Sequence, residues 1–234
     1  MEYKVLTGLV SEARLKRYLI ATGDFSAAVD MYKANILVAQ AFHPLLSIFE
    51  VILRNQIDRT LTNYFGDTDW ILNQRSGFMV DSALSYYDYK IRRDKKDEYI
   101  IKEVNKAENK LKRLKVSVTS GGVVAEQMFG FWTELFENNY YKVLKGRPIQ
   151  IFEKLPPGIG RKEISDYLNK IRLFRNRINH NEPICFVSDR IDFLPAEEIY
   201  SRLVMLLDWI DPQILYWISD IDSVKDSINN AKSI

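Results

Sequence analysis

The residues best suited to chemistry lie in the segment IRLFRNRINHNEPI, residues 171–184. It places Arg175, Asn176 and His180 within two helical turns of one another. An imidazole titrates near neutral pH and can move a proton, while a guanidinium can hold a phosphate and stabilise the charge that grows on it. These groups suit cleavage of RNA, because the 2′-hydroxyl serves as nucleophile and no metal is required. The sequence offers no plausible cluster of metal ligands, and we expect neither a metal nor a cofactor.

The element that must position these residues is a helix predicted over residues 161–181, which stops before Pro183. Asn176 and His180 are four residues apart and share the polar face. Arg175 falls inside the apolar arc, where it either reaches the edge of the core or meets a polar partner in a cleft. The predicted core face consists of Ile164, Tyr167, Leu168, Ile171, Phe174 and Ile178.

The count of histidines limits this chemistry, because the chain has only two. One imidazole cannot easily be both acid and base, and on an ideal helix Arg175 and His180 lie about 140° apart. Two copies of the helix facing each other across a symmetric dimer would form a composite site with two arginines and two histidines. We expect His43, beside Pro44, to be a capping or core histidine. The same structural role stays open as an alternative for His180. Cys185, the single cysteine, is expected to be buried.

The spacing of apolar residues is helical nearly throughout, which predicts an all-α fold. Ser11 and Asp24 are candidate N-caps, and Pro44 is expected to begin a third helix. Residues 67–76 are expected to be a loop anchored by Trp70, and residues 140–160 an irregular segment. Further helices are expected over 82–114, 123–136, 195–207 and 212–229, and the nearest candidate strand, 184–187, is weak. We expect a single helical domain over 1–234, which can be subdivided into N-terminal helices (1–76), a basic and aromatic middle (77–160) and C-terminal helices (161–234).

Charge is segregated along the chain, although the net charge is only +2. Residues 90–115 hold eleven Lys or Arg against five Asp or Glu, whereas the chain from Phe186 onward holds nine acidic residues against four basic ones. The basic run is either a solvated helical hairpin or a surface that contacts phosphates. Residues 158–162 form either a plain turn or a weak anion site before a helix. With no signal peptide and no apolar run long enough for a membrane span, we expect a cytoplasmic protein.

Three blocks of sequence carry a family resemblance. The segment RNRINH, residues 175–180, resembles the Arg-x4-x6-His signature of the HEPN superfamily (higher eukaryote and prokaryote nucleotide-binding), in the RN-x-x-x-H form of its ribonucleases. Residues 42–70 resemble the "E-x-x-LRN-x-I…FG…W" block of bacterial Abi-like abortive-infection proteins, residues 121–136 their "FGFW…LF" block, and residues 175–184 their "RNRxxHxEPI" block. Asn181 stands where the family often has a second histidine.

The resemblance implies a HEPN-like helical bundle, a homodimer and metal-independent RNA cleavage in defence against phage, with an antitoxin or a phage-derived trigger as a further partner. It places Arg175 and His180 in catalytic positions and Asn176 in a supporting one. It also gives supporting roles to Glu50, Arg54, Asn55 and Glu182, where Glu50 and Arg54 are either groups that orient the site or a structural ion pair. We add Arg161, Lys162, Arg172 and Arg177 as candidate contacts to RNA.

A second interpretation keeps the fold without the chemistry. The helix with the Arg and His motif could serve a non-catalytic module that binds RNA or another protein. RNA binding that weakens with salt, without cleavage, would favour that interpretation. A DNA-binding regulator has little support, because no helix-turn-helix with a basic recognition helix is evident.

Overall fold

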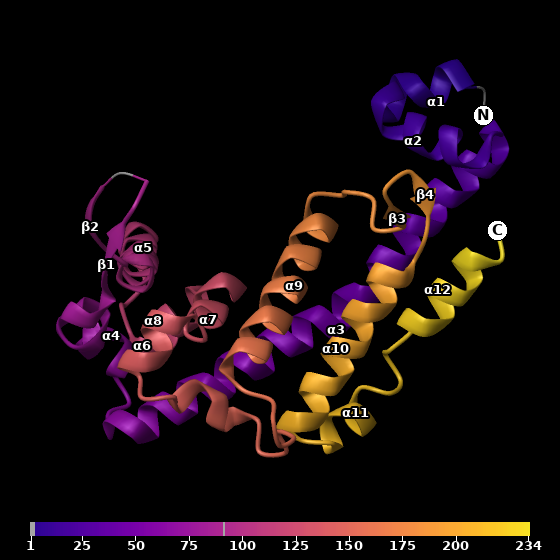
Figure 1. The fold of residues 1–234 in the computed structure, drawn as a ribbon. Coiled ribbons are helices and arrows are strands. Elements are labelled where there is room, and N and C mark those ends of the chain that lie inside the picture. Colours follow the sequence, from indigo (N-terminus) through magenta and orange to yellow (C-terminus); the bar gives the residue numbers. More distant parts are fainter. Residues whose placement is uncertain (1–2, 91) are drawn as a thin grey trace. The chain divides into compact units, whose positions relative to one another are not determined.

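The predicted helical class is confirmed by a computed structural model, which describes residues 3–90 and 92–234 and has 70% of the residues in helices (Figure 1). The chain divides into two compact units. Unit 1 is the chain up to Phe49 together with Leu173–Ile234, and unit 2 is Glu50–Arg172. Helices α3 (Phe25–Phe65) and α9 (Arg161–Asn179) each contribute residues to both units.

Helix α3 is one continuous helix, which corrects the predicted break at His43 and Pro44. As predicted, Asp24 caps its start, because the Asp24 carboxylate accepts a hydrogen bond from the main-chain N–H of Ala27 (2.8 Å). Proline within a helix removes one main-chain donor and usually breaks the helix. Here Phe42, Leu45 and other large apolar side chains on both sides of Pro44 are buried, and their packing keeps the helix continuous.

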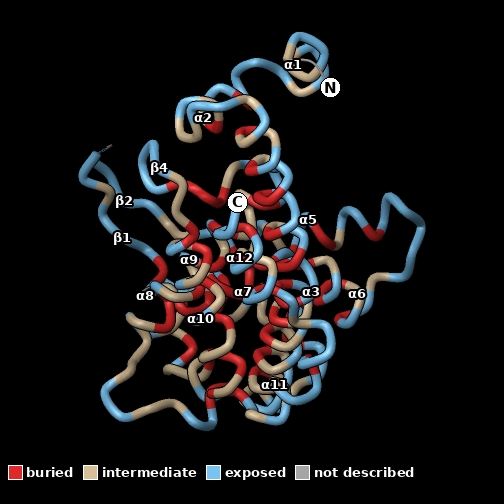
Figure 2. Tube along the Cα trace, turned by 90° about the vertical axis from the view of Figure 1, so that its right-hand side faces the viewer, coloured by how far each residue is buried: buried red, intermediate tan, exposed pale blue. Residues whose placement is uncertain are grey.

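Unit 1 is built from helices around the first half of α3 and the last turns of α9. Helices α1 (Tyr3–Val10) and α2 (Glu12–Thr22) lie at the N-terminal end of α3, and Figure 2 draws α1 without a buried residue. A short hairpin, β3 (Phe186–Val187) paired with β4 (Arg190–Ile191), follows α9 and was not predicted as a pair. Three helices complete the unit: α10 (Leu194–Ile210), α11 (Gln213–Trp217) and α12 (Val224–Lys232). The helix predicted over 212–229 is therefore two helices.

Unit 2 contains short elements where longer ones were predicted. Residues 82–114 form a 3-10 turn (η3, Ser82–Leu84), the hairpin β1 (Ser85–Asp88) and β2 (Arg93–Lys96), and helix α5 (Tyr99–Arg113); Ile91 lies outside the described residues. Residues 120–136 form α6 (Ser120–Glu126) and α7 (Phe129–Glu134) instead of one helix. The remaining elements are α4 (Trp70–Asn73), η1 (Gln74–Ser76), η2 (Phe78–Val80), α8 (Asn138–Val143) and η4 (Arg147–Ile151).

Trp70 anchors its segment as expected. Its ring is fully buried, and its indole N–H donates a hydrogen bond to the Asp58 carboxylate (2.8 Å). The segment around it is a short helix followed by a 3-10 turn, and not the plain loop that was predicted.

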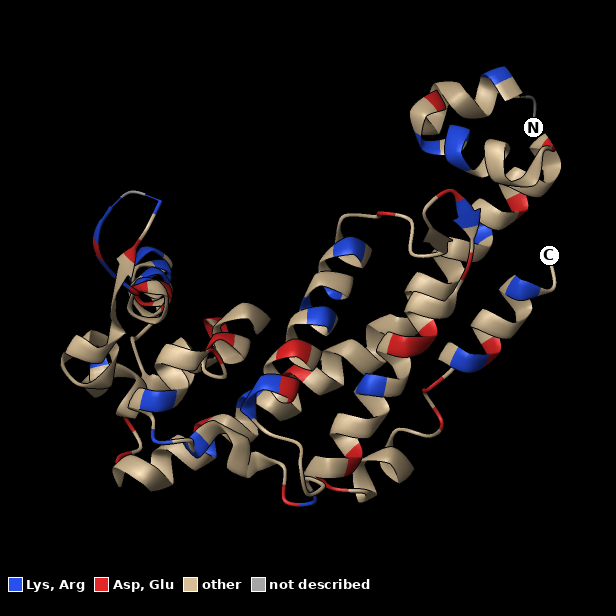
Figure 3. Cartoon of the chain, viewed as in Figure 1, with Lys and Arg blue, Asp and Glu red and all other residues tan. Residues whose placement is uncertain are grey.

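The basic segment of unit 2 separates into two parts. On α5, Lys102, Lys106, Lys110 and Lys112 each form an ion pair with a glutamate. Figure 3 shows further basic residues on the hairpin, where Arg93 and Lys95 of β2 are exposed. The excess positive charge of this segment is therefore concentrated on the hairpin more than on α5.

Helix α3 is long and apolar enough to pass a test for a membrane span, with a mean hydropathy of 1.9 over its most apolar window. Many of its apolar side chains, among them Val38, Phe49 and Leu61, are buried in the protein. Core helices of proteins outside membranes pass the same test, and the cytoplasmic location stays a prediction.

Candidate active site

The C-terminal end of α9 fixes the backbone of the predicted catalytic residues. The N–H of His180 donates to the carbonyl of Asn176 (2.9 Å), and the chain then turns at Asn181, whose φ is +52°. The N–H of Glu182 donates to the carbonyl of Arg177 (2.8 Å), and that of Asn181 to the carbonyl of Ile178 (2.9 Å). This is the hydrogen-bond pattern of a Schellman motif, with His180 at the C-cap and Asn181 in the left-handed position.

Two elements of unit 1 hold the loop that follows. Arg14 of α2 donates through Nη1 to the main-chain carbonyl of Asn181 (2.8 Å). Asn35 of α3 is buried, and its side-chain oxygen accepts the N–H of Ile184 (2.8 Å). Because both partners lie more than 140 residues away in sequence, the fold and not the local sequence sets the path of this loop.

The three motif residues differ in exposure. Arg175 and Asn176 are half-buried, whereas the side chain of His180 is exposed. Phe174 and Ile178 are buried, and the ring of Phe174 packs edge-on against Phe42 (4.8 Å between centroids). The predicted core face of the helix is thus confirmed, with an exposed imidazole at its end.

The supporting residue Glu182 lies beside the motif. Its carboxylate is 3.6 Å from Nε of Arg177, which also donates through Nη2 to the carbonyl of Pro183. Arg177, a candidate contact to RNA, is therefore engaged in holding the turn.

The first block places its residues on α3 in unit 2. Arg54 donates through Nε to the side-chain oxygen of Asn55 (3.3 Å). The role of Glu50, Arg54 and Asn55 in orienting the site stays a prediction.

The candidate RNA contacts at the other end of α9 have local partners. Arg161 donates to the carbonyl of Phe136 (3.2 Å), and Lys162 is exposed. The carboxylate of Glu163 accepts the N–H of Gly160 (3.0 Å), and main-chain hydrogen bonds of Glu163 itself and of Gly160 lower the pKa of this carboxyl group. Glu163 thus occupies the helix start where the sequence suggested a weak anion site.

Arg172 belongs to a polar cluster in unit 2 that the sequence did not indicate. Its Nη2 donates to the side-chain oxygen of Asn169 (3.1 Å), and Nδ2 of Asn169 donates to the Glu137 carboxylate (2.7 Å). Burial raises the pKa of the nearby Glu134 to about 7, the charges of Asp97 and Glu137 add to this rise, and Arg172 opposes it. These contacts give Arg172 a structural partner independently of RNA.

A polar cavity of about 480 Å³ adjoins the turn after α9 within unit 1. Asn181 and Glu182 line it together with Arg14 of α2 and His43 of α3. His43 is exposed and lies in the interior of α3. The prediction that His43 is a core or capping histidine is therefore wrong, because α3 continues through Pro44 and turns the His43 side chain outward.

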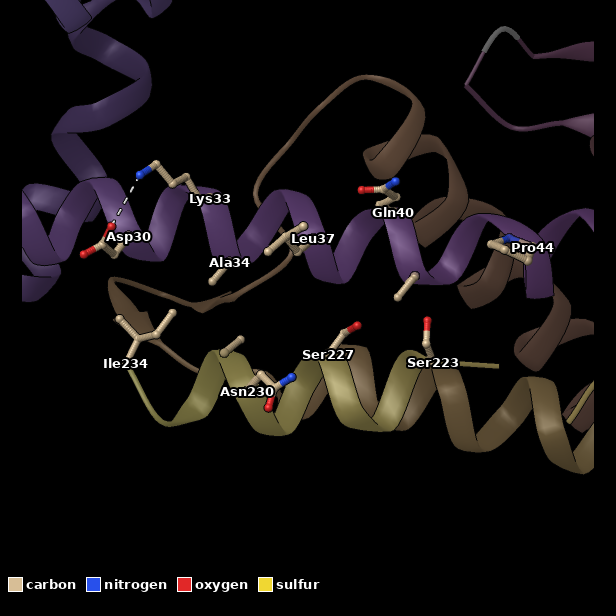
Figure 4. Close-up of a pocket in the computed structure, with 12 residues that line it drawn as sticks. Asp30, Lys33, Ala34, Leu37, Gln40, Pro44, Ser223, Ser227, Asn230 and Ile234 are labelled. Carbon is tan, nitrogen blue, oxygen red and sulfur yellow. Dashed lines mark ion pairs between the residues drawn. The ribbon is translucent and has the colours of Figure 1, made fainter. Parts of the chain in front are cut away.

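A larger cavity of unit 1, about 660 Å³, has a different character. Figure 4 shows it between α3 and α12, with Leu37 and Ala34 facing Ser227 and Asn230. Its charged lining residues, Asp30 and Lys33, form an ion pair with each other (3.6 Å). Its lining combines apolar surface with hydroxyl and amide groups.

Within residues 3–90 and 92–234, no three His, Cys, Asp or Glu side chains form a cluster that could hold a metal ion. Comparison of the chain with protein-family models, curated proteins and solved structures gives no match.

Proposed function

We propose that this chain is an endoribonuclease that cleaves RNA without a metal, through Arg175, Asn176 and His180. The observation that supports it best is the exposed imidazole of His180 at a C-cap whose backbone is fixed, one turn after Asn176. The next two residues, Asn181 and Glu182, line a cavity. The resemblance to Abi-like proteins of the HEPN superfamily suggests that it acts in bacterial defence against phage, triggered by a phage component or held in check by an antitoxin.

The chemistry follows from the groups present. A general base takes the proton of the 2′-hydroxyl, the 2′-oxygen bonds to phosphorus, and the bond from phosphorus to the 5′-oxygen breaks. A general acid gives a proton to the departing 5′-oxygen. Arg175 stabilises the added negative charge on the phosphate in the transition state. The products are a 2′,3′-cyclic phosphate and a 5′-hydroxyl, so no water or metal enters the step.

We also propose that the chain acts as a homodimer in which two copies of Arg175 and His180 form one composite site. Refolding wild-type chains with an excess of inactive His180→Ala chains should then lower cleavage more steeply than the fraction of wild-type chains, because a mixed dimer keeps only one of the two imidazoles. Chains that stay monomeric while cleaving RNA would contradict this arrangement.

The main experiment measures cleavage of a structured RNA in EDTA. Wild-type protein should leave 2′,3′-cyclic phosphate ends, and His180→Ala should lower kcat by about 100-fold or more, the usual contribution of an acid–base group. The control is Asn179→Ala, an exposed neighbour without an assigned role. If His180→Ala cleaves as fast as wild type, the proposal fails, whereas salt-dependent RNA binding without cleavage would favour the binding module.

A further inference from the structure

The cavity beside α9 brings together groups from three parts of unit 1. Arg14 comes from α2, His43 and Gln40 from α3, and Asn181 and Glu182 from the turn after α9. Its volume of about 480 Å³ lies in the range of small-ligand sites. Its lining thus combines a cation, an imidazole, a carboxylate and amides.

The cavity adjoins the turn that follows the proposed catalytic His180, because Asn181 and Glu182 line it, whereas His180 is not among its lining residues. Asn181 follows His180 directly, and consecutive Cα atoms are about 3.8 Å apart. Arg14 holds the carbonyl of Asn181, so α2 fixes this side of the cavity. The side of the cavity that adjoins the proposed catalytic residue is therefore held by a tertiary contact.

Helix α3 presents His43 to the same space. Tyr32, Ile36 and His43 are spaced by four and seven residues, which places them on one face of the helix, and all three line the cavity. The preceding residue, Phe42, is buried and packs against Phe174 of α9. This contact holds α3 against the end of α9, and the exposed imidazole of His43 therefore has a fixed helix behind it.

Arg14 supplies a charge suited to a phosphate. Its hydrogen-bond acceptor is the neutral carbonyl of Asn181, and within the part of the chain that the structure describes no carboxylate lies at ion-pair distance from it. The one carboxylate of the cavity, Glu182, lies 3.6 Å from Arg177. The cavity therefore retains a cation that a phosphate oxygen could approach.

We propose that this cavity is the nucleotide subsite of the ribonuclease site, and that His43 is its second proton-transfer residue, acting with His180 of the same chain. The inference rests on the proposed cleavage of RNA, and it takes the second imidazole from His43 of the same chain in place of the second His180 that the composite dimer site would supply. One imidazole takes the proton of the 2′-hydroxyl and the other gives a proton to the 5′-oxygen, while Arg14 binds a phosphate of the substrate. The other titratable or charged groups that face His43 are Arg14 of α2, Tyr32 of α3 and Glu182.

Kinetics give the first test. In full-length protein, His43→Gln should lower kcat by about 100-fold or more and remove one limb of a bell-shaped pH–rate profile. Added imidazole should restore part of the activity of His43→Ala, which a structural role would not predict. The control is Ser47→Ala, an exposed position one turn further along α3. If His43→Gln retains the wild-type kcat and pH profile, the inference is wrong and the proposed function stands.

Nuclear magnetic resonance gives a test that needs no cleavage, because the chain has only two histidines. The variants His43→Gln and His180→Gln assign the two sets of imidazole signals in a folded protein. Uridine 3′-monophosphate should then shift the His43 signals of the wild type. In Arg14→Gln, the nucleotide concentration that gives half of this shift should rise by tenfold or more.

The two proposals fail in different ways. A wild-type chain that leaves RNA intact would remove the proposed function and with it the proton-transfer role of His43, while a nucleotide-induced shift at His43 would still support the subsite. If the His43 signals do not move at millimolar nucleotide, the subsite is wrong, whatever the cleavage assay shows.

Discussion

At the scale of single residues, two asparagines determine how the chain leaves α9. Asn181 adopts the left-handed conformation that asparagine accepts more readily than most residues, and so lets the helix close directly after His180. Asn35 is 5% exposed and accepts the N–H of Ile184, which would otherwise be a buried main-chain donor without a partner. The position of the imidazole therefore depends on residues that do no chemistry.

The Asn35 contact can be measured as stability. Asn35→Ala should lower the free energy of unfolding by about 2 kcal/mol, because it leaves a buried main-chain donor unsatisfied. Urea unfolding followed by circular dichroism measures the change. Asn63→Ala, an exposed asparagine on the same helix, should change the value by less than about 0.5 kcal/mol. Equal effects of the two substitutions would contradict a special role for Asn35.

At the scale of elements, the long helix α3 carries the most unusual feature. Pro44 lies in its interior, so the carbonyl of Gln40 lacks the N–H donor that residue 44 would normally supply. The helix stays continuous because Phe42, Leu45 and Phe49 are buried around it. Without this continuity, His43 would sit at a helix end.

Replacing the proline should therefore stabilise the protein. Pro44→Ala restores a main-chain donor for the carbonyl of Gln40 and is expected to raise the free energy of unfolding by about 2 kcal/mol. Proline in a helix interior costs about 3 kcal/mol or more. Part of this cost is offset because proline also lowers the conformational entropy of the unfolded chain. Thermal and urea unfolding test it. Pro195→Ala, in the first turn of α10 where proline is well tolerated, is the matched control. A lower melting temperature for Pro44→Ala than for the wild type would show that Pro44 does not destabilise α3.

The sequence predicts the regular helices well and the interrupted ones poorly. Residues 161–179 and 194–210 combine apolar periodicity with proline near an end, and both helices begin and end within a few residues of the prediction. The hairpin at 85–96 has strands whose residues are mostly exposed, so no apolar alternation indicates it. The break between α6 and α7 lies at Gln127 and Met128 and has neither glycine nor proline.

The candidate site could be predicted only where its residues are contiguous in sequence. The segment with Arg175 and His180 is visible because one helix carries both. The contributions of Arg14 and His43 depend on packing between α2, α3 and the turn after α9, and no local pattern encodes that packing. The helical spacing of Tyr32, Ile36 and His43 could have revealed His43, had the helix been extended through Pro44.

At the scale of the whole molecule, stability is linked to pH through the polar cluster of unit 2. Burial and the charges of Asp97 and Glu137 raise the pKa of Glu134 to about 7, against 4.5 for the ordinary side chain, and Arg172 opposes this. Between these values the folded protein binds a proton that the unfolded chain releases. The stability from this group is therefore complete below about pH 4.5 and is lost as the pH rises through about 7.

This linkage predicts a slope that one substitution removes. From pH 5 to pH 7 Glu134 should contribute a fall in the free energy of unfolding of at most about 1.4 kcal/mol per pH unit, the limit for one proton. Glu134→Gln should lose that contribution, while Glu153→Gln, at an exposed position, should keep it. Urea unfolding at a series of pH values measures it, and an unchanged pH dependence in Glu134→Gln would contradict the role of this carboxyl group.

The burial of the single cysteine, Cys185, has a practical consequence for site-specific labelling. Cys185 is completely buried beside Tyr18, and burial raises the pKa of its thiol to about 11. A maleimide or a spin label would therefore find no accessible thiolate on the folded chain. A cysteine introduced at any exposed position, such as the tip of the basic hairpin, would be labelled alone, so the natural sequence already serves as the unreactive background for distance measurements between two copies of the chain.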